Sequence, residues 1–138
     1  MDFGEAPFFS MLRTQLTHLG ERQKLVAENI ANATTPGYVP RDTDEKAFAQ
    51  AMAQASSDSG GLAMARTNPM HVGGEGSTTY STAIIKAPDS ETTLDGNAVV
   101  LEDQMLKSSE TRMAYETNLA LYQKGLELMR LAIKAPGK

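Results

Sequence analysis

Side chains that commonly bind metal ions are few and scattered in this chain. The 138 residues include two histidines and no cysteine. His18 shares one face of an expected helix with Glu21, and His71 stands in the turn-rich stretch TNPMH. A metal site needs three or four converging ligands, and no third ligand accompanies either histidine. We therefore predict no metal site, and the lack of cysteine excludes disulfide and thiolate chemistry.

Two further motifs resemble reactive sites in composition only. The glycine-rich stretch GGEGS, residues 73–77, has no lysine after it and no strand-to-helix context, both of which a phosphate-binding loop requires. Glu102 and Asp103 are adjacent carboxylates, but they fall where a helix is expected to begin, and there they stabilise the positive helix end. No nucleophile is accompanied by a base and an orienting residue. We predict that the chain is not an enzyme and holds no cofactor or small-molecule substrate.

Composition excludes further classes of protein. The net charge is −4 and only 6% of the residues are aromatic, without tryptophan. No basic stripe with interleaved aromatic residues is present, so we predict no nucleic-acid partner. No apolar run reaches the roughly 18 residues that a membrane span needs. The first residues, MDFGEAPFFSML, lack the basic segment and long apolar run of a secretory signal, so a cleaved signal peptide is not expected.

Two stretches of apolar periodicity dominate the chain. The first alternates steps of three and four residues, which is the heptad pattern of packed helices, through Phe9, Leu12, Leu16, Leu19, Gln23, Val26, Ile30 and Ala33. The second continues the same pattern through Ala98, Leu101, Met105, Ser108, Arg112, Tyr115, Leu119, Tyr122, Leu126, Met129 and Ile133. Further apolar residues widen this second helix almost all round, among them Leu106, Met113, Leu121, Leu128 and Leu131. Such a helix is expected to contact several neighbours.

The middle of the chain has a different character. Residues 56–79 are rich in Ser, Gly, Asn and Thr, which indicates loops or disorder. A short helix is predicted within 42–55, with Asp42 as its N-cap, and a short strand within 78–85. The predicted fold is mainly α. Helices in residues 1–35 and 98–138 pair as one coiled-coil inner domain around a flexible, partly disordered insert, 36–97.

The junction between the first helix and the insert is a sharp turn. Pro36 disfavours the α conformation at Thr35 and cannot donate the backbone hydrogen bond of a continuing helix. Pro36-Gly37 is also a favoured central pair of a type II turn, which predicts a positive φ at Gly37. Tyr38 is then expected to fold back on the helix that the chain has just left.

The stretch LVAENIANATTPGYVPRD around this turn resembles the signature of the bacterial flagellar basal-body rod family, the rod and hook axial proteins. The residues that match the signature are Asn29, Ile30, Ala31, Asn32, Thr35, Pro36, Gly37 and Tyr38. The total length, the segment TNPMH and the run DGNAVVLEDQM before the last helix are most similar to a proximal-rod member. A sister rod subunit that shares the turn signature is the alternative.

The resemblance implies a structural subunit that leaves the cytoplasm through the flagellar type III export apparatus without a cleaved signal. It then polymerises in the periplasm-spanning rod and is needed for motility. The implied partners are other rod subunits and the basal-body base, with its MS ring and FliE-type adaptor. The candidate assembly seam comprises Leu16, Leu19, Val26, Leu119, Tyr122, Leu126, Met129 and Ile133.

Two questions stay open at the level of the sequence. Phe8 and Leu12 resemble the Phe-x-x-x-apolar export motif of early flagellar substrates, but both also fit the apolar face of the first helix. From a different class of protein, a soluble coiled-coil adaptor or secretion chaperone would share the paired terminal helices.

Overall fold

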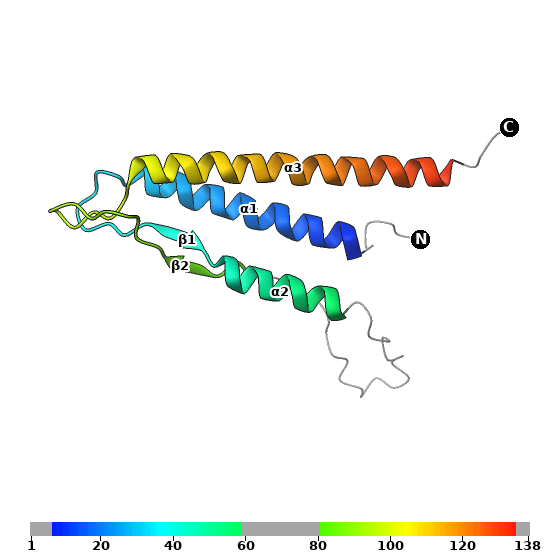
Figure 1. Ribbon diagram of the computed structural model, residues 1–138, viewed down its shortest axis with the longest axis horizontal. Coiled ribbons are helices and arrows are strands. Elements are labelled where there is room, and N and C mark those ends of the chain that lie inside the picture. The colour runs from blue at the N-terminus through cyan, green and yellow to red at the C-terminus, as the bar shows by residue number, and fades with distance from the viewer. Residues whose placement is uncertain (1–6, 59–80, 135–138) are drawn as a thin grey trace, which may run out of the picture.

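The computed structural model describes residues 7–58 and 81–134. The elements are α1 (Pro7–Ala31), β1 (Arg41–Thr43), α2 (Glu45–Asp58), β2 (Ile84–Lys86) and α3 (Leu101–Ile133). Helix α3 lies antiparallel along α1, and α2 lies on the opposite side of α1 (Figure 1). The predicted mainly helical fold with paired terminal helices is confirmed. Of the stretch 56–79 that was predicted to be loop or disorder, residues 56–58 instead continue α2, and the remainder, with His71 and the GGEGS stretch, lies outside the described residues.

Helix α1 begins and ends where its sequence favours it. Pro7 occupies the first helical position, where its missing N–H has no helical partner to lose. At the other end, the backbone N–H and the side-chain Nδ2 of Asn32 both donate to the Glu28 carbonyl, at 3.1 and 2.8 Å. The next N–H, that of Ala33, donates to the Ile30 carbonyl only three residues back, and the helix ends at Ala31, before the last position of the predicted seam.

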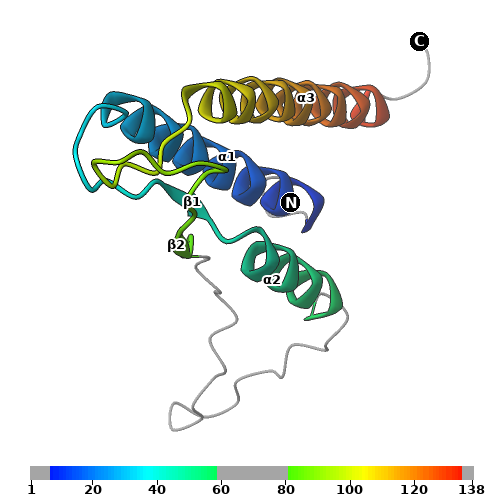
Figure 2. The ribbon, with the colours of Figure 1, turned by 60° about the vertical axis from the view of Figure 1, so that its left-hand side comes forward.

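The hydrophobic core lies on two sides of α1. Its buried apolar side chains are contributed mainly by α1, with Ala98 and Val99 from the segment before α3; the α1 members are Phe9, Leu12, Leu19, Leu25 and Val26. Gln23, the polar member of the predicted seam, is exposed. The view in Figure 2 shows α1 between α3 and the layer formed by β1, β2 and α2. No helix among the described residues is long and apolar enough to cross a lipid bilayer.

The face of α3 that packs on α1 overlaps the predicted apolar seam only in part, because the seam residues Tyr122 and Met129 are half-buried there. The buried residues of α3 are Gln104, Thr111 and Asn118, which repeat every seven residues. Several large seam residues are exposed instead: Leu101, Met105, Leu119, Leu126 and Ile133. Periodicity detects an apolar stripe but not the partner that covers it, so a stripe reserved for another molecule gives the same signal as one buried within the chain.

Two of the polar residues on this inner face, Thr111 and Asn118, have their hydrogen bonds satisfied within α3. The Thr111 hydroxyl donates to the Lys107 carbonyl at 2.7 Å, and Asn118 Nδ2 donates to the Ala114 carbonyl at 2.9 Å. Bonding one turn back along the helix removes most of the cost of burying these groups. The α1–α3 contact is thereby more polar than the sequence pattern predicted.

The insert begins with a small ordered unit. Strands β1 and β2 pair antiparallel, with Asp42 opposite Ile85. The strand lies at Ile84–Lys86, so it overlaps the end of the predicted range 78–85, of which residues 78–80 lie outside the described residues. The predicted cap of α2 is also corrected. Asp44, not Asp42, accepts hydrogen bonds from the first helical N–H groups, those of Lys46 and Ala47, at 2.9 and 3.0 Å.

Aromatic rings join the start of α1 to the distal part of α3. The ring centroids of Phe9 and Tyr122 lie 5.4 Å apart in an edge-to-face arrangement, and Phe8 meets Phe9 in the same way. Gly125 lies beneath these rings. A Cβ at Gly125 would lie 3.1 Å from the Phe9 ring and 3.2 Å from the Phe8 ring. Glycine therefore permits this close approach of α3 to α1.

The two helical glycines are expected to respond oppositely to alanine. A Cβ at Gly20 would meet nothing within 4 Å, so Gly20→Ala should raise the free energy of unfolding by about 0.5 to 1 kcal/mol through helix propensity. Gly125→Ala should not raise the free energy of unfolding, because the added Cβ forces the Phe9 ring to move. Urea unfolding followed by circular dichroism measures both variants. An equal gain at the two positions would contradict the close packing at Gly125.

Candidate functional site

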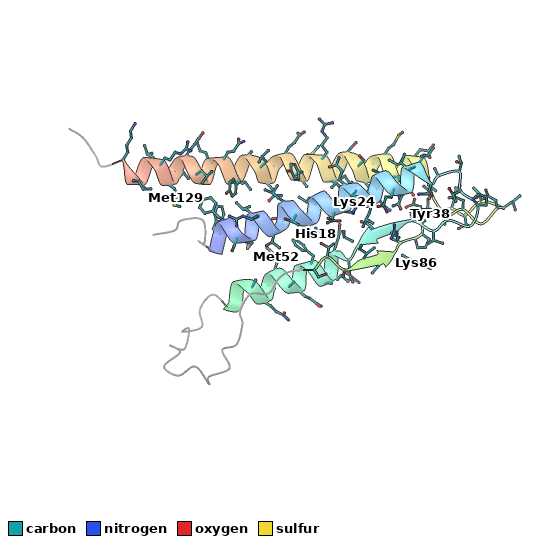
Figure 3. The ribbon with its side chains drawn as sticks, turned by 180° about the vertical axis from the view of Figure 1, so that it is seen from behind. His18, Lys24, Tyr38, Met52, Lys86 and Met129 are labelled. Carbon is teal, nitrogen blue, oxygen red and sulfur yellow. The ribbon has the colours of Figure 1, made fainter. Side chains whose placement is uncertain are left out.

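The family-signature residues lie at the end of the molecule where α1 ends, which Tyr38 marks in Figure 3. At its centre is Asn29, whose side chain is buried. Its Nδ2 donates to the Arg41 carbonyl at 2.8 Å, and its Oδ1 accepts from the Arg41 N–H at 3.0 Å. The amide thus pairs with Arg41 as a neighbouring strand would. Oδ1 also accepts from the Tyr38 hydroxyl at 3.1 Å, which folds this ring back toward α1.

The remaining donor of Asn29 extends the network to α3. Nδ2 also donates to Oε1 of the fully buried Gln104 at 3.0 Å. Gln104 Nε2 donates in turn to both carboxylate oxygens of Asp89, at 3.0 and 2.8 Å. Lys107 Nζ donates to Asp89 at 2.8 Å, and the backbone N–H of Val100 does so at 3.0 Å. We call Asn29, Gln104, Asp89 and Lys107 the polar clamp, because it joins α1, the segment before α3, and α3 itself.

Asp89 is the charged centre of the polar clamp, with a side chain only 1% exposed. Burial by itself raises the pKa of this carboxyl group. The hydrogen bonds from Lys107, Gln104 and the Val100 N–H, together with the charge of Lys107, outweigh that effect and hold the pKa below its ordinary value of 3.8. Asp89 is therefore ionised at neutral pH and is stabilised in that form by the folded structure.

A second asparagine closes the turn itself. Asn97 Nδ2 donates to the carbonyls of Asn32 and Thr35, at 3.0 and 2.7 Å, and so satisfies carbonyls that the end of α1 leaves open. The turn is closed by the Tyr38 N–H, which donates to the Thr35 carbonyl at 3.3 Å. Gly37 has φ of +69°, as a type II turn requires. Its N–H also donates to the Asp95 carbonyl at 3.0 Å.

A separate polar group holds the insert against the outer side of α1. The guanidinium of Arg22 contacts both oxygens of Asp42, at 3.1 and 3.3 Å, and Glu45 at 2.5 Å. The buried His18 ring stacks on Phe48 of α2, with centroids 3.9 Å apart. Figure 3 shows His18 on the side of α1 that faces α2. Burial, and then the charge of Arg22, lower the pKa of His18, while Glu45 and Asp42 oppose this shift.

These groups hold segments of the backbone in place. The hydrogen bonds of the polar clamp end on other groups of the fold. Within residues 7–58 and 81–134, no three His, Cys, Asp or Glu side chains are grouped as metal ligands would be. The arrangement fixes the direction in which the chain leaves α1 and returns to α3.

The other candidate residues are spread over the fold. Ile30 is half-buried, whereas Thr35, Pro36 and Gly37 are exposed at the turn. The two candidate export residues differ in exposure, because Phe8 is 51% exposed while Leu12 is buried in the core. In the seam, Leu19 and Val26 are buried, and Leu16, Tyr122 and Met129 are half-buried. Figure 3 shows Met129 on the side of α3 toward α1.

Sequence reasoning missed three members of this site: Gln104, Asp89 and Lys107. A polar residue within an apolar heptad pattern gives no signal of its own, and Asp89 lies in a stretch interpreted as loop. The one available signal was the run DGNAVVLEDQM, which was linked to the family and contains both Asn97 and Gln104.

Removal of the Asn29 side chain should be costly. Asn29→Ala leaves the N–H and carbonyl of Arg41 and the Oε1 of Gln104 without their partner, so the free energy of unfolding should fall by at least about 2 kcal/mol. The matched control is Asn32→Ala, which loses two side-chain bonds near the surface, one to the Glu28 carbonyl and one from the Thr35 hydroxyl, and should cost about 1 kcal/mol or less. Chemical denaturation measures both variants. Equal losses would contradict the central place of Asn29.

The charge of Asp89 should make stability depend on pH in a defined direction. Because its folded-state pKa lies below the ordinary value, its contribution is complete above about pH 3.8 and is lost as pH falls through the folded-state pKa. Asp89→Asn should be less stable at neutral pH, but should lose less stability than the parent between about pH 5 and about pH 3. Urea titrations across this range test it. Parallel pH profiles for the two proteins would contradict the stabilised carboxylate.

Comparison with known proteins gives the family. No protein-family model matches the chain. It is 34% identical to the flagellar basal body rod protein FlgB of Agrobacterium fabrum over 129 residues, which cover 91% of this chain and 92% of that protein. It is 34% identical to FlgB of Cereibacter sphaeroides over 113 residues, 82% of this chain and 83% of the relative. FlgB of Salmonella typhimurium is 28% identical over 102 residues, 73% and 74% of the two chains. The chain therefore belongs to the FlgB family of flagellar basal body rod proteins.

Proposed function

We propose that this protein is a structural subunit of the proximal rod in the bacterial flagellar basal body. The observation that carries the proposal is the apolar surface that α3 does not bury within the chain. Leu128 is 57% exposed, Leu131 is 69% exposed and Ile133 is 63% exposed. Exposed apolar surface of this extent is typical of a face that another protein covers. A subunit of a helical polymer needs such faces, because each copy contacts several neighbours through non-closing interfaces.

The polar inner face of α3 supports the same role. In a self-sufficient coiled-coil adaptor, the apolar stripe would be buried between the two helices. Here Gln104, Thr111 and Asn118 face α1, and the large aliphatic side chains face outward. The pair is thus built to be completed by other subunits. The FlgB relatives favour this subunit over the sister rod protein FlgC, which the turn signature alone left as an alternative.

Export and assembly place different demands on the chain. We propose that it passes the flagellar type III export apparatus unfolded and without a cleaved signal, and then folds and assembles in the rod. Its partners would be other rod subunits and the MS ring with its FliE-type adaptor. The role is structural and not catalytic, and motility depends on it. Phe8 remains a candidate export residue because half of its side chain is accessible, whereas Leu12 is accessible only in the unfolded chain.

Charge on the outer face of α3 should separate assembly from folding. Leu128→Glu with Leu131→Glu should leave helicity and secretion intact, because both side chains are exposed in the single chain. Rod assembly should fail, since each contact would then bury a carboxylate. Swimming, secreted protein and hook-basal bodies are measured in a strain that lacks its own copy of the subunit.

The control for this test is Glu110→Gln with Gln123→Glu, at two exposed positions of the same helix. It should restore swimming like the parent chain. Normal rods built from the Leu128→Glu, Leu131→Glu subunit would contradict the proposed role of this face. Loss of secretion would instead place an export determinant in the last helix.

A further inference from the structure

Helix α2 is attached to α1 less extensively than the other elements are. Within the described residues, α1 lies in long contact with α3 and with β1, whereas the backbone of α2 comes close to α1 at few points. Strand β1 is fixed to α1 by the hydrogen bonds of Asn29 with Arg41 and by those of Arg22 with Asp42. Figure 2 shows α2 extending from β1 alongside α1. A rotation about Asp44, between β1 and α2, would therefore move α2 and leave β1 in place.

Two neighbouring side-chain contacts hold α2 against α1. The ring of His18 stacks on Phe48, with centroids 3.9 Å apart and planes only 10° apart. One turn later on α1, the guanidinium of Arg22 lies 2.5 Å from a carboxylate oxygen of Glu45. The Glu45 side chain is 64% exposed, and ion pairs exposed to water contribute little to stability. The stack of His18 on Phe48 is therefore the more important of the two contacts.

The charges around His18 are already paired with one another. The charged groups that act on its ring are Arg22 of α1, Asp42 of β1 and Glu45 of α2; β2 and the described part of α3 add none. Both oxygens of Asp42 accept hydrogen bonds from Arg22, and Glu45 contacts the same guanidinium. A proton on His18 would thus add a second positive charge beside Arg22, where both carboxylates already have a cationic partner.

Burial opposes a charge on His18 as well. The residue is 4% exposed, so an imidazolium in the stacked position would lose most of its hydration. The face of the Phe48 ring attracts a cation, but this attraction is smaller than the cost of burying a charge away from water. Burial and Arg22 lower the pKa of His18 more than Glu45 and Asp42 raise it. The stacked form is therefore favoured fully above the ordinary pKa of 6.5 and less as the pH falls below it.

We propose that His18 is a pH-sensitive latch, which holds α2 on α1 while its ring is neutral and releases α2 when its ring is protonated. In the released form α2 turns away about Asp44, and the imidazolium is surrounded by water. Strand β1 stays on α1, since Asn29 does not titrate. Release uncovers the side of α2 that carries Phe48 and Met52, both half-buried when α2 is attached. The inference goes beyond the proposed rod function and concerns the single chain.

Distance measurements in the full-length chain test the latch. The chain has no cysteine of its own, so spin labels can be placed at Lys24→Cys on α1 and Gln50→Cys on α2, two exposed positions. Pulsed electron paramagnetic resonance gives the distance distribution at about pH 7.5 and at about pH 5, on either side of the ordinary histidine pKa. We expect one short distance at the higher pH and a longer, broader population that grows several-fold at the lower pH. Because one proton is taken up, the ratio of released to attached chains should rise by no more than about tenfold per pH unit.

Four control proteins isolate the role of His18. A label pair at Lys24→Cys and Glu110→Cys, on α1 and α3, should keep its distance at both pH values. In the Lys24–Gln50 label pair, His18→Phe retains a stacking ring without a titrating group and should stay attached at both. Phe48→Ala removes the stack and should show the longer population at both. His71→Gln replaces the other histidine of the chain and should respond to pH like the parent.

Each result supports the latch or overturns it. An α1–α2 distance that is the same at both pH values in the parent chain would overturn it. Release of the His18→Phe chain at the lower pH would also overturn it, because a carboxylate would then be responsible, and so would loss of the response in His71→Gln. If His18→Phe loses helicity, nuclear magnetic resonance of the His18 ring in the parent decides instead. Its protonation must then follow the release of α2 with a midpoint below pH 6.5, and a midpoint at or above the ordinary pKa of 6.5 would contradict the latch. None of these outcomes bears on whether the chain restores swimming, which tests the proposed function separately.

Discussion

The fold depends on the hydrogen bonding of one buried amide, that of Asn29. Its two donors and two acceptor positions are used on Arg41, Tyr38 and Gln104. Those partners belong to the strand that follows the turn, the turn itself and the last helix. A buried amide that bonds in several directions tolerates little displacement of any partner, because an unsatisfied polar group in the interior is costly. The direction of the insert and the register of α3 are set together by this side chain.

Asp89 transmits the same constraint to the beginning of α3. Its carboxylate accepts hydrogen bonds from the side chains of Gln104 and Lys107 and from the Val100 N–H. A negative charge at this end of α3 is favoured by the helix dipole. The lowered pKa of Asp89 has its own causes, which are the hydrogen bonds from Lys107, Gln104 and the Val100 N–H and the charge of Lys107. The polar clamp therefore fixes which side of α3 turns toward α1. Once that side is polar, the aliphatic side chains of α3 must face outward.

This division of surfaces agrees with the proposed role in a polymer. A single chain whose helices are joined partly by polar contacts is expected to unfold more readily than one whose helices are packed through a continuous leucine seam, which agrees with the proposed export in an unfolded state. The apolar faces then contribute to stability only when neighbouring copies bury them. The small unit of β1, β2 and α2 is attached separately, by Arg22 and the His18–Phe48 stack.

The sequence by itself determined the two long helices, the turn between α1 and the insert, and the family. Each of these depends on local signals. Heptad spacing predicts helices, Pro36 and Gly37 predict the turn, and the Asn-rich signature is contiguous. The tertiary structure alone decided the rotation of α3, the roles of Gln104 and Asp89, and the choice of Asp44 over Asp42 as a helix cap. Asp42 could not be assigned from its neighbours because its partner, Arg22, lies 20 residues earlier in the chain. Which side of α3 faces α1 could not be predicted from the sequence for a related reason. Apolar periodicity reports that a face will be buried, but only contacts between distant residues decide whether the same chain or another copy buries it.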